Sequence, residues 1–459
     1  MGLKGLLRYK FNSYCIALNF SAMVALLGAN TAHSAGFAGL ESDGFLRTSN
    51  DRSVSAYILS VGPEFSGRSK TIEGKFDLSA RVFTSNISSI TLESHNAYIA
   101  TSSELMTRHQ ITLGRRQMDW SVLDDTWKFG LWSPRFLWDP LRPEQIGLTG
   151  AFYQHHSSVW RITGYASPVA IPERSYPVQN VGGRLSSPSP FFIPLPERLV
   201  VMNNQSVAIN YNIKAPNYNE VIFRPNAGFQ MRYGREQGFW GSAGYAYLPI
   251  HQVDLAIEAS LSIPSNTMNA DIYPRFPMHH MITAETGYNH RMWSLWGSVT
   301  GEQPTTVPSK ENWISNSTGP ALISSAGGSL KWQEGLTVSG SYLFVLEKNT
   351  GLTGPSMAQN IQLTLPSRFP YRRAFVVGGN WDRGSPTAFG AKWTLDTENQ
   401  SSLISGDMLY RARWKKKFSR DEQWAFGLGA DFISSATKKG TIGQYHGDDR
   451  VRGSVTYVF

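Results

Sequence analysis

The chain has 459 residues and a formal net charge of +9, and only 17% of its residues are charged while 12% are aromatic. Low charge with many aromatic side chains excludes a disordered chain. A mean hydropathy of −0.27, without an apolar run long enough to span a bilayer as a helix, excludes a bundle of transmembrane helices. The single Cys excludes a disulfide framework and a cysteine-based zinc site, so a large soluble β-protein or a membrane barrel remains.

Residues 1–35 have the three parts of a secretory signal peptide. Three basic residues come first, an apolar stretch runs from Cys15 to Ala29, and small residues surround the cleavage position predicted after Ser34 or Ala35. We expect residues 36–459 to form one exported domain that contains no Cys. Its 40 basic and 34 acidic residues are dispersed, so we expect no nucleic-acid partner.

Apolar and polar residues alternate with a period of two in many segments of the mature chain. The clearest cover 72–82, 206–214, 253–263, 338–346, 389–395, 408–414 and 424–432. Runs of about ten residues with this period suit strands that cross a membrane at a tilt. We therefore predict an all-β fold, a transmembrane antiparallel up-and-down β-barrel. Phe37–Leu46 is the candidate first strand, and the alternation slips within 90–100 as at a β-bulge.

Short turns and long polar loops connect these segments, as expected for a barrel with turns at one rim and loops at the other. The long connections are predicted at about 119–150, 166–204, 264–280, 302–324 and 436–449. A soluble β-sandwich would also alternate. Aromatic residues at the ends of the apolar faces and single charges in mid-strand favour the membrane barrel.

The segment after Arg116 contains four Trp residues outside any clean strand. With a first strand near Phe37 it is the third outer loop, and the plan resembles that of trimeric porins, whose third loop folds inward. The resemblance implies that this loop forms a constriction in the lumen and that the protein is a homotrimer. The alternative for the loop is that it packs on the outer rim of the barrel. The candidate constriction residues are Asp119, Trp120, Asp124, Asp125, Trp127, Trp132, Arg135, Trp138 and Asp139.

The proline-rich connection 166–204 surrounds the apolar segment Phe191-Phe192-Ile193. Proline orders such a loop at low entropic cost. Exposed apolar residues at its centre would form an interaction patch. The loop can therefore plug the lumen, pack between subunits or contact a surface partner.

Basic residues gather on the presumed lumen face of the late strands. They are Lys392, Arg411, Arg413, Lys415, Arg450 and Arg452. Arg411 and Arg413 lie two apart and share a face, while Tyr410, Ala412 and Trp414 form the lipid face. A basic wall opposite an acidic loop would give a mild anion preference. The alternative is that these charges pair locally.

The last strand, 451–459, ends in Phe with Tyr two residues before it. This pattern resembles the closing strand of Gram-negative outer-membrane β-barrels, which the barrel-assembly machinery reads. The resemblance assigns that signal to Val455, Tyr457 and Phe459 and implies contact with outer-membrane lipid and lipopolysaccharide. About 424 mature residues suit about 18 strands, with a range of about 16 to 20, and such a barrel leaves an aqueous channel.

We therefore expect an outer-membrane porin, a water-filled channel for passive diffusion of small hydrophilic solutes or ions. We expect no enzymatic activity, because no nucleophile motif accompanies the His pairs, and no cofactor or metal. Two alternatives stay open. One is a plugged transporter of hydrophobic compounds, since Ala35-Gly36-Phe37 is similar to the start of the long-chain fatty-acid transporter family, although its helical plug and Asn-Pro-Ala segment are missing. The other is a surface adhesin or structural barrel.

Overall fold

The computed structural model describes most of the chain. It covers residues 32–459 apart from 47–54, 85–89, 201–205, 217, 263, 306–311, 317, 333–334, 349–351, 354–367, 385, 414–422, 438 and 459. The predicted signal peptide lies almost wholly outside the described residues. Its last four residues, Ala32–Ala35, begin the first strand, so the cleavage position stays a prediction.

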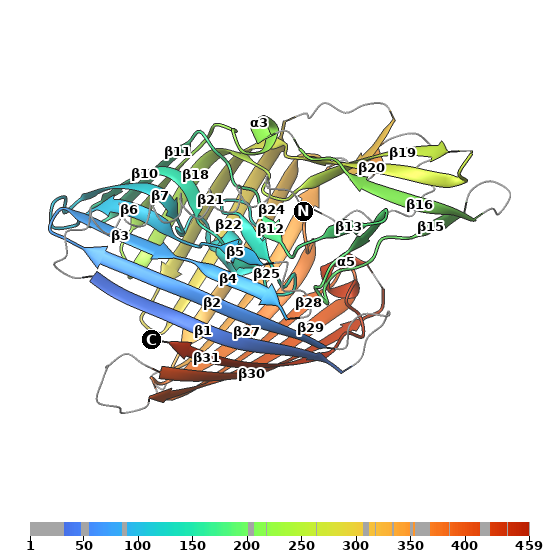
Figure 1. Ribbon diagram of the computed structural model, residues 1–459. Coiled ribbons are helices and arrows are strands. Elements are labelled where there is room, and N and C mark those ends of the chain that lie inside the picture. Colours follow the sequence, from blue (N-terminus) through green and yellow to red (C-terminus); the bar gives the residue numbers. More distant parts are fainter. Residues whose placement is uncertain are drawn as a thin grey trace.

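The wall is one closed antiparallel sheet of 18 strands (Figure 1). Its strands in chain order are β1 (Ala32–Phe45), β2 (Ser55–Arg68), β3 (Ile72–Asp77) with β4 (Ser79–Phe83), β5 (Thr91–Glu93) with β6 (Ala97–Thr101), β7 (His109–Arg116), β10 (Leu148–His156), β11 (Trp160–Ser167), β17 (Asn226–Gly234), β18 (Gly238–Pro249), β21 (Met278–Asn289), β22 (Trp293–Pro304), β24 (Ala321–Lys331), β25 (Leu336–Glu347), β27 (Arg373–Asp382), β28 (Thr387–Asp396), β29 (Ser401–Arg413), β30 (Gln423–Ser435) and β31 (Arg450–Val458). Each strand pairs with its neighbours, and β31 pairs with β1 to close the ring. The predicted fold class and the strand number of about 18 are confirmed.

Two wall strands are interrupted at the same level. Leu78 separates β3 from β4, and residues 94–96 separate β5 from β6. The Asp77 carboxylate stabilises this break by accepting hydrogen bonds from the backbone N–H groups of His95 and Asn96, at 2.7 and 2.8 Å. The slip predicted within 90–100 is therefore present as a local break in the ladder.

Short turns join the strands at one rim, here called the turn rim, and longer connections join them at the other, here called the loop rim. The long connections are 117–147, 168–225, 250–277, 305–320, 348–372 and 436–449. The sequence missed 348–372 and began or ended several others at the wrong residue. Within the part of the chain that is described, no helix is long and apolar enough to cross a membrane.

The outer face of the wall is apolar, as contact with lipid requires. Ile282, Leu428 and Phe432 expose 64%, 60% and 51% of their surface there. Aromatic pairs lie at the turn rim, among them Trp160 with Tyr233, and their ring centroids are 4.6 Å apart. Such a girdle is typical of a membrane–water interface.

The loops build a second sheet beyond the loop rim, at the upper right of Figure 1. Its order is β15 (Arg198–Val200), β16 (Ser206–Ile213), β20 (Thr267–Arg275), β19 (Asp254–Ser262), β23 (Trp313–Asn316) and β26 (Leu352–Thr353), and β16 runs parallel to β20. The loops also contain a hairpin of β13 (Gln179–Val181) and β14 (Arg184–Ser186), and a short helix α3 (Tyr218–Val221).

The prediction that 206–214 and 253–263 cross the membrane is therefore wrong. These segments form β16 and β19 of the outer sheet. Their alternation arises because Ile209, Tyr211 and Ile257 pack into an apolar cluster on one face of that sheet, while the other face is polar. A half-buried soluble sheet has the same period as a lipid-facing strand.

Candidate functional site

The connection 117–147, here called the third loop, is the third one at the loop rim, and it packs against inward faces of the wall. It contains helix α2 (Val122–Trp127) and the short strands β8 (Arg135–Leu137) and β9 (Glu144–Gln145), to which β12 (Arg174–Ser175) adds. Ser121 caps α2 by accepting the Asp124 N–H. The buried Asp124 carboxylate then accepts the N–H groups of Gly130, Leu131 and Trp132 at 2.8–3.1 Å, which fixes the turn after the helix.

Tryptophans anchor the first half of the third loop to the wall. The rings of Trp120 and Trp132 stack with centroids 5.0 Å apart. Trp132 Nε1 donates to Thr283 on β21, and Trp127 Nε1 donates to Ser325 on β24. Indole N–H groups that are buried with a partner avoid the cost of an unsatisfied donor. This half of the loop therefore lies inside the barrel.

The second half reaches the opposite wall. Trp138 stacks on Phe83 of β4 with centroids 4.5 Å apart. Arg135 is buried and pairs with Glu173 of the connection 168–225 at 2.7 Å. Leu141 joins an apolar cluster with Phe45 of β1. The third loop therefore spans the interior from β21 and β24 to β1 and β4.

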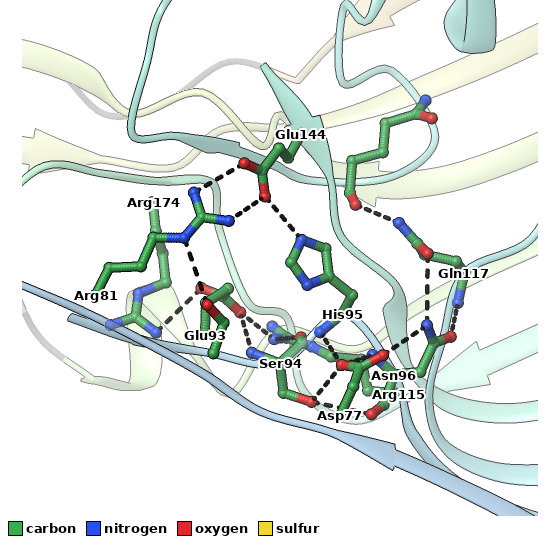
Figure 2. Close-up of polar contacts among 12 residues, drawn as sticks. Asp77, Arg81, Glu93, Ser94, His95, Asn96, Arg115, Gln117, Glu144 and Arg174 are labelled. Carbon is green, nitrogen blue, oxygen red and sulfur yellow. Dashed lines mark hydrogen bonds and ion pairs between the residues drawn. The ribbon is translucent and has the colours of Figure 1, made fainter. Parts of the chain in front are cut away.

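Glu144 fixes the return of the third loop to the wall (Figure 2). Its two carboxylate oxygens accept hydrogen bonds from Arg81 of β4 at 2.8 and 2.9 Å, and one of them lies 3.1 Å from His95 Nε2. Burial alone would raise the pKa of Glu144, but the hydrogen bonds from His95 and Arg81 lower that pKa to about 2. A bidentate, charge-assisted contact of this kind gives the loop a defined position.

A network of charges joins the third loop to the late strands. Arg450 is fully buried and lies 2.5 Å from Asp431 of β30 and 2.5 Å from Asp139 of the loop. Arg142 of the loop pairs with both Asp431 and Asp407, and Arg452 pairs with Asp407 at 2.6 Å. Arg450 and Arg452 are therefore held by carboxylates, as in the local-pairing alternative, and Arg450 presents no surface to water.

The other predicted basic residues have different positions. Lys392 lies on the inward phase of β28, with Thr394 and Asp396, and it is exposed in the lumen. Arg411 lies at the turn rim and pairs with Asp382 at 3.2 Å. The side chain of Arg413 and the whole of Lys415 lie outside the described residues.

Two open polar cavities lie beside the start of the third loop. One, of about 360 Å³, is lined by Gln117, Met118, Asp119, Asp125, Lys128, Ser133 and Gln145. The other, of about 150 Å³, is lined by Arg116, Gln117, Met118, Asp119, Trp120, Gln154, Arg161, Thr163 and Gln230. They share Asp119, which is exposed. Among the predicted constriction residues, Asp119 and Asp125 therefore face open space, while Asp124 and the tryptophans hold the loop.

Sequence reasoning missed a row of arginines on the wall beside these cavities. Arg116 of β7, Arg161 of β11 and Arg232 of β17 belong to it, and Arg161 and Arg232 are direct neighbours in the ladder. Within the described residues, none of the three has a carboxylate within 4.0 Å; Arg116 donates to Gln110 and Thr112, and Arg232 stacks over Trp240. The inward phase of each strand was a signal that could have found them.

The connection 168–225 also enters the barrel. Phe191 is buried beside Phe45 and Tyr445, and its ring lies 4.9 Å from the Arg450 guanidinium. Near it lies the short helix α5 (Gly440–Gly443). Of the three roles considered for the segment Phe191-Phe192-Ile193, which were plugging the lumen, packing between subunits and contacting a surface partner, this position favours the first.

The residues of the predicted assembly signal lie within β31, near its turn-rim end, or outside the described residues. Val455 is exposed on the outer face of β31. The Tyr457 ring lies 4.9 Å from that of Trp424. Phe459 is not among the described residues. Among the residues that are described, no group of three or more His, Cys, Asp or Glu side chains is arranged to hold a metal ion.

Comparison with known proteins finds similar solved structures. No protein-family model and no curated protein sequence matches the chain. OccK2 (OpdF) of Pseudomonas aeruginosa has a TM-score of 0.47 and 8% identity, covering 93% of this chain and 97% of that one. OccAB4 of Acinetobacter baumannii has a TM-score of 0.45 and 8% identity, covering 93% and 97%. OccK3 (OpdO) of P. aeruginosa has a TM-score of 0.45 and 7% identity, covering 93% and 95%. By its closed, even-stranded wall and apolar outer band, the chain has the architecture of a transmembrane, porin-like β-barrel.

Proposed function

We propose that the chain forms a water-filled channel for passive diffusion of small hydrophilic solutes, narrowed by the third loop and favouring anions. The observation that carries this proposal is the pair of open polar cavities that share Asp119. Polar lining on the inside and an apolar band on the outside are the properties of a barrel that conducts water-soluble compounds.

The anion preference is supported by the arginines that lack a carboxylate partner. An arginine paired with a carboxylate adds little to the potential seen by a passing ion, whereas Arg116, Arg161 and Arg232 keep their full charge. Like the three arginines, Lys392 on β28 has no carboxylate within 4.0 Å among the described residues. It therefore adds a fourth unpaired positive charge. Charges that line a narrow passage raise the local concentration of counter-ions.

Reversal potentials in a salt gradient across a planar bilayer test the proposal. Arg161→Gln with Arg232→Gln should shift the selectivity toward cations, most clearly at low salt, where screening is weakest. Arg411→Gln is the matched control, because Arg411 also lies on an inward phase but is paired with Asp382. If the double variant and the Arg411→Gln control both form steady pores with the same shift in reversal potential, the arginine row has no special role in selectivity.

One observation favours a plugged transporter as the second candidate. The third loop and the Phe191 segment pack on the inner wall through apolar clusters that reach β1, β4, β10, β21 and β25. Such packing restricts the passage to the polar cavities. A barrel that stays silent in planar bilayers but takes up hydrophobic compounds would support this candidate over an open channel.

We also propose that residues 1–35 are removed on export and that the barrel-assembly machinery reads the chain end at Val455, Tyr457 and Phe459. Lipopolysaccharide and outer-membrane lipid would then surround the apolar band. A homotrimer is the corresponding proposal for the assembly, and cross-linking in native membranes tests it.

A further inference from the structure

Asp124 and Asp125 are adjacent in α2, yet their carboxylates have different surroundings. Asp124 is buried, and its oxygens accept three backbone hydrogen bonds within the third loop. Asp125 is only partly buried and lines the open cavity of about 360 Å³. Asp124 therefore stabilises the third loop, while the Asp125 carboxylate lies at the cavity.

The groups around Asp125 do not neutralise it. Lys128, one turn further along, donates its ammonium hydrogen bond to Gln145 Oε1 at 2.6 Å. Among the described residues, no cation lies within 4.0 Å of the Asp125 carboxylate. The charged groups that face it are Asp119, Asp124 and Lys128. Gln145 Nε2 donates to the Asp124 carbonyl at 3.3 Å.

We infer that Asp125 makes the ion selectivity of the passage depend on pH, by gaining and losing a proton. This inference rests on the proposed channel function. When ionised, Asp125 gives this cavity a second carboxylate beside Asp119. When protonated, it leaves Asp119 as the acid shared by the two cavities, and the passage becomes more positive and more selective for anions.

The position of Asp125 sets the pH range in which this happens. Burial, followed by the neighbouring Asp124 carboxylate, raises the pKa of Asp125 to about 7. The carboxyl is therefore neutral below that pH and ionised above it. An ordinary Asp would complete its titration well below neutral pH, at about 4. The anion selectivity should accordingly rise as the pH falls through about 7.

The test uses the full-length barrel in planar bilayers, with reversal potentials in a KCl gradient from about pH 5.5 to 8.5. The ratio of anion to cation permeability should increase at least about twofold as the pH falls across this range, most at low salt. Asp125→Asn should remove the step and keep the ratio at its low-pH value. Asp119→Asn should raise the ratio at every pH but leave the step in place.

A conducting wild-type barrel without a step, or an Asp125→Asn barrel that keeps it, would overturn the inference while leaving the channel function intact. A silent barrel would instead contradict the channel function and the selectivity role together. The infrared carboxyl band of the detergent-solubilised protein separates proton binding from conduction. The intensity of the neutral-carboxyl band at about pH 6 should fall in Asp125→Asn by the contribution of one carboxyl, and an unchanged intensity would assign the proton to another group.

Discussion

Arg450 shows how the structure changes the meaning of a charge that the sequence places in the lumen. The period of two puts Arg450 and Arg452 on one face of the last strand. Their carboxylate partners include Asp139, which is 311 residues away along the chain in a loop. Strand alternation predicts which face of the sheet a side chain lies on. It contains no information about which loop side chain contacts it there.

Replacing Arg450 should weaken the barrel strongly. Arg450→Met removes the cation between Asp139 and Asp431 and leaves the buried Asp431 carboxylate with fewer partners. Breaking a buried pair costs about 3–5 kcal/mol. The temperature at which the folded, faster-migrating form converts on a gel measures this loss. Arg411→Met is the control, because its pair with Asp382 is exposed to solvent and such pairs contribute little to stability. Equal melting of the two variants would contradict the assigned burial.

At the scale of elements, the third loop was foreseen in part. Its density of Trp residues indicated a loop that needs apolar burial, and its position as the third long connection followed from a first strand near Phe37. Trp120, Trp127 and Trp132 are indeed buried in this loop. The sequence could not separate the holding role of Asp124 from the cavity-facing position of Asp125, because adjacent acids on a short helix differ only in their tertiary surroundings.

The outer sheet is where the sequence reasoning failed at this scale. Segments 206–214 and 253–263 have the alternation of membrane strands, but their apolar faces pack against each other and against loop residues such as Leu185 and Leu199. Periodicity reports that one face of a strand avoids water; it does not report whether lipid or protein covers that face. The parallel pair β16–β20 also joins two different loops, which no local pattern encodes.

Glu144 should control how firmly the third loop is held. Glu144→Gln keeps the size of the side chain but loses the charge that binds Arg81 and His95, so we expect more frequent conductance fluctuations and faster proteolysis within 117–147. Glu104→Gln, at an exposed turn, is the control. Single-channel recordings and limited proteolysis measure the two effects. If Glu144→Gln has the same frequency of conductance fluctuations and the same rate of proteolysis as the wild-type protein, the anchoring role is contradicted.

The same anchor gives a dependence on pH whose sign follows from the pKa. Because the folded state lowers the pKa of Glu144 to about 2, the ionised form stabilises the loop. That contribution is complete above about pH 4.5 and is lost as the pH falls toward about 2. The side chain is 38% exposed, so solvent screening keeps the contribution modest. Proteolysis of the wild-type loop should therefore increase in acid, and Glu144→Gln should reduce this increase.

For the whole molecule, closure of the ring is the property on which everything else depends. The last strand pairs with β30 on one side and β1 on the other, from Phe37 opposite Val458 to Phe45 opposite Arg450. This follows from the predicted first strand and the chain end. The number of strands could be predicted because the length and the even-strand rule constrain it, even though individual segments were misassigned.

Deletion of Phe459 should reduce the amount of assembled barrel far more than a change in the outer sheet such as Ser260→Ala. The reason is that the proposed assembly signal ends in this residue, whereas Ser260 is exposed in β19. Heat-modifiable protein in outer-membrane fractions measures assembly. Equal yields of the two variants would show that the chain end has no special role.

The central claim is that an open aqueous passage runs beside the third loop at Asp119, and thiol modification of a single Cys tests it most directly. The one Cys of the chain, Cys15, lies in the predicted signal peptide, so the mature barrel offers a background without thiols. Asp119→Cys should conduct steadily in a planar bilayer and lose a large part of its conductance when a bulky, charged methanethiosulfonate is added. Ser260→Cys, exposed on the outer sheet, should conduct equally and be unaffected by the reagent. A barrel that does not conduct, or an Asp119→Cys barrel whose modified form conducts as before, would contradict the account.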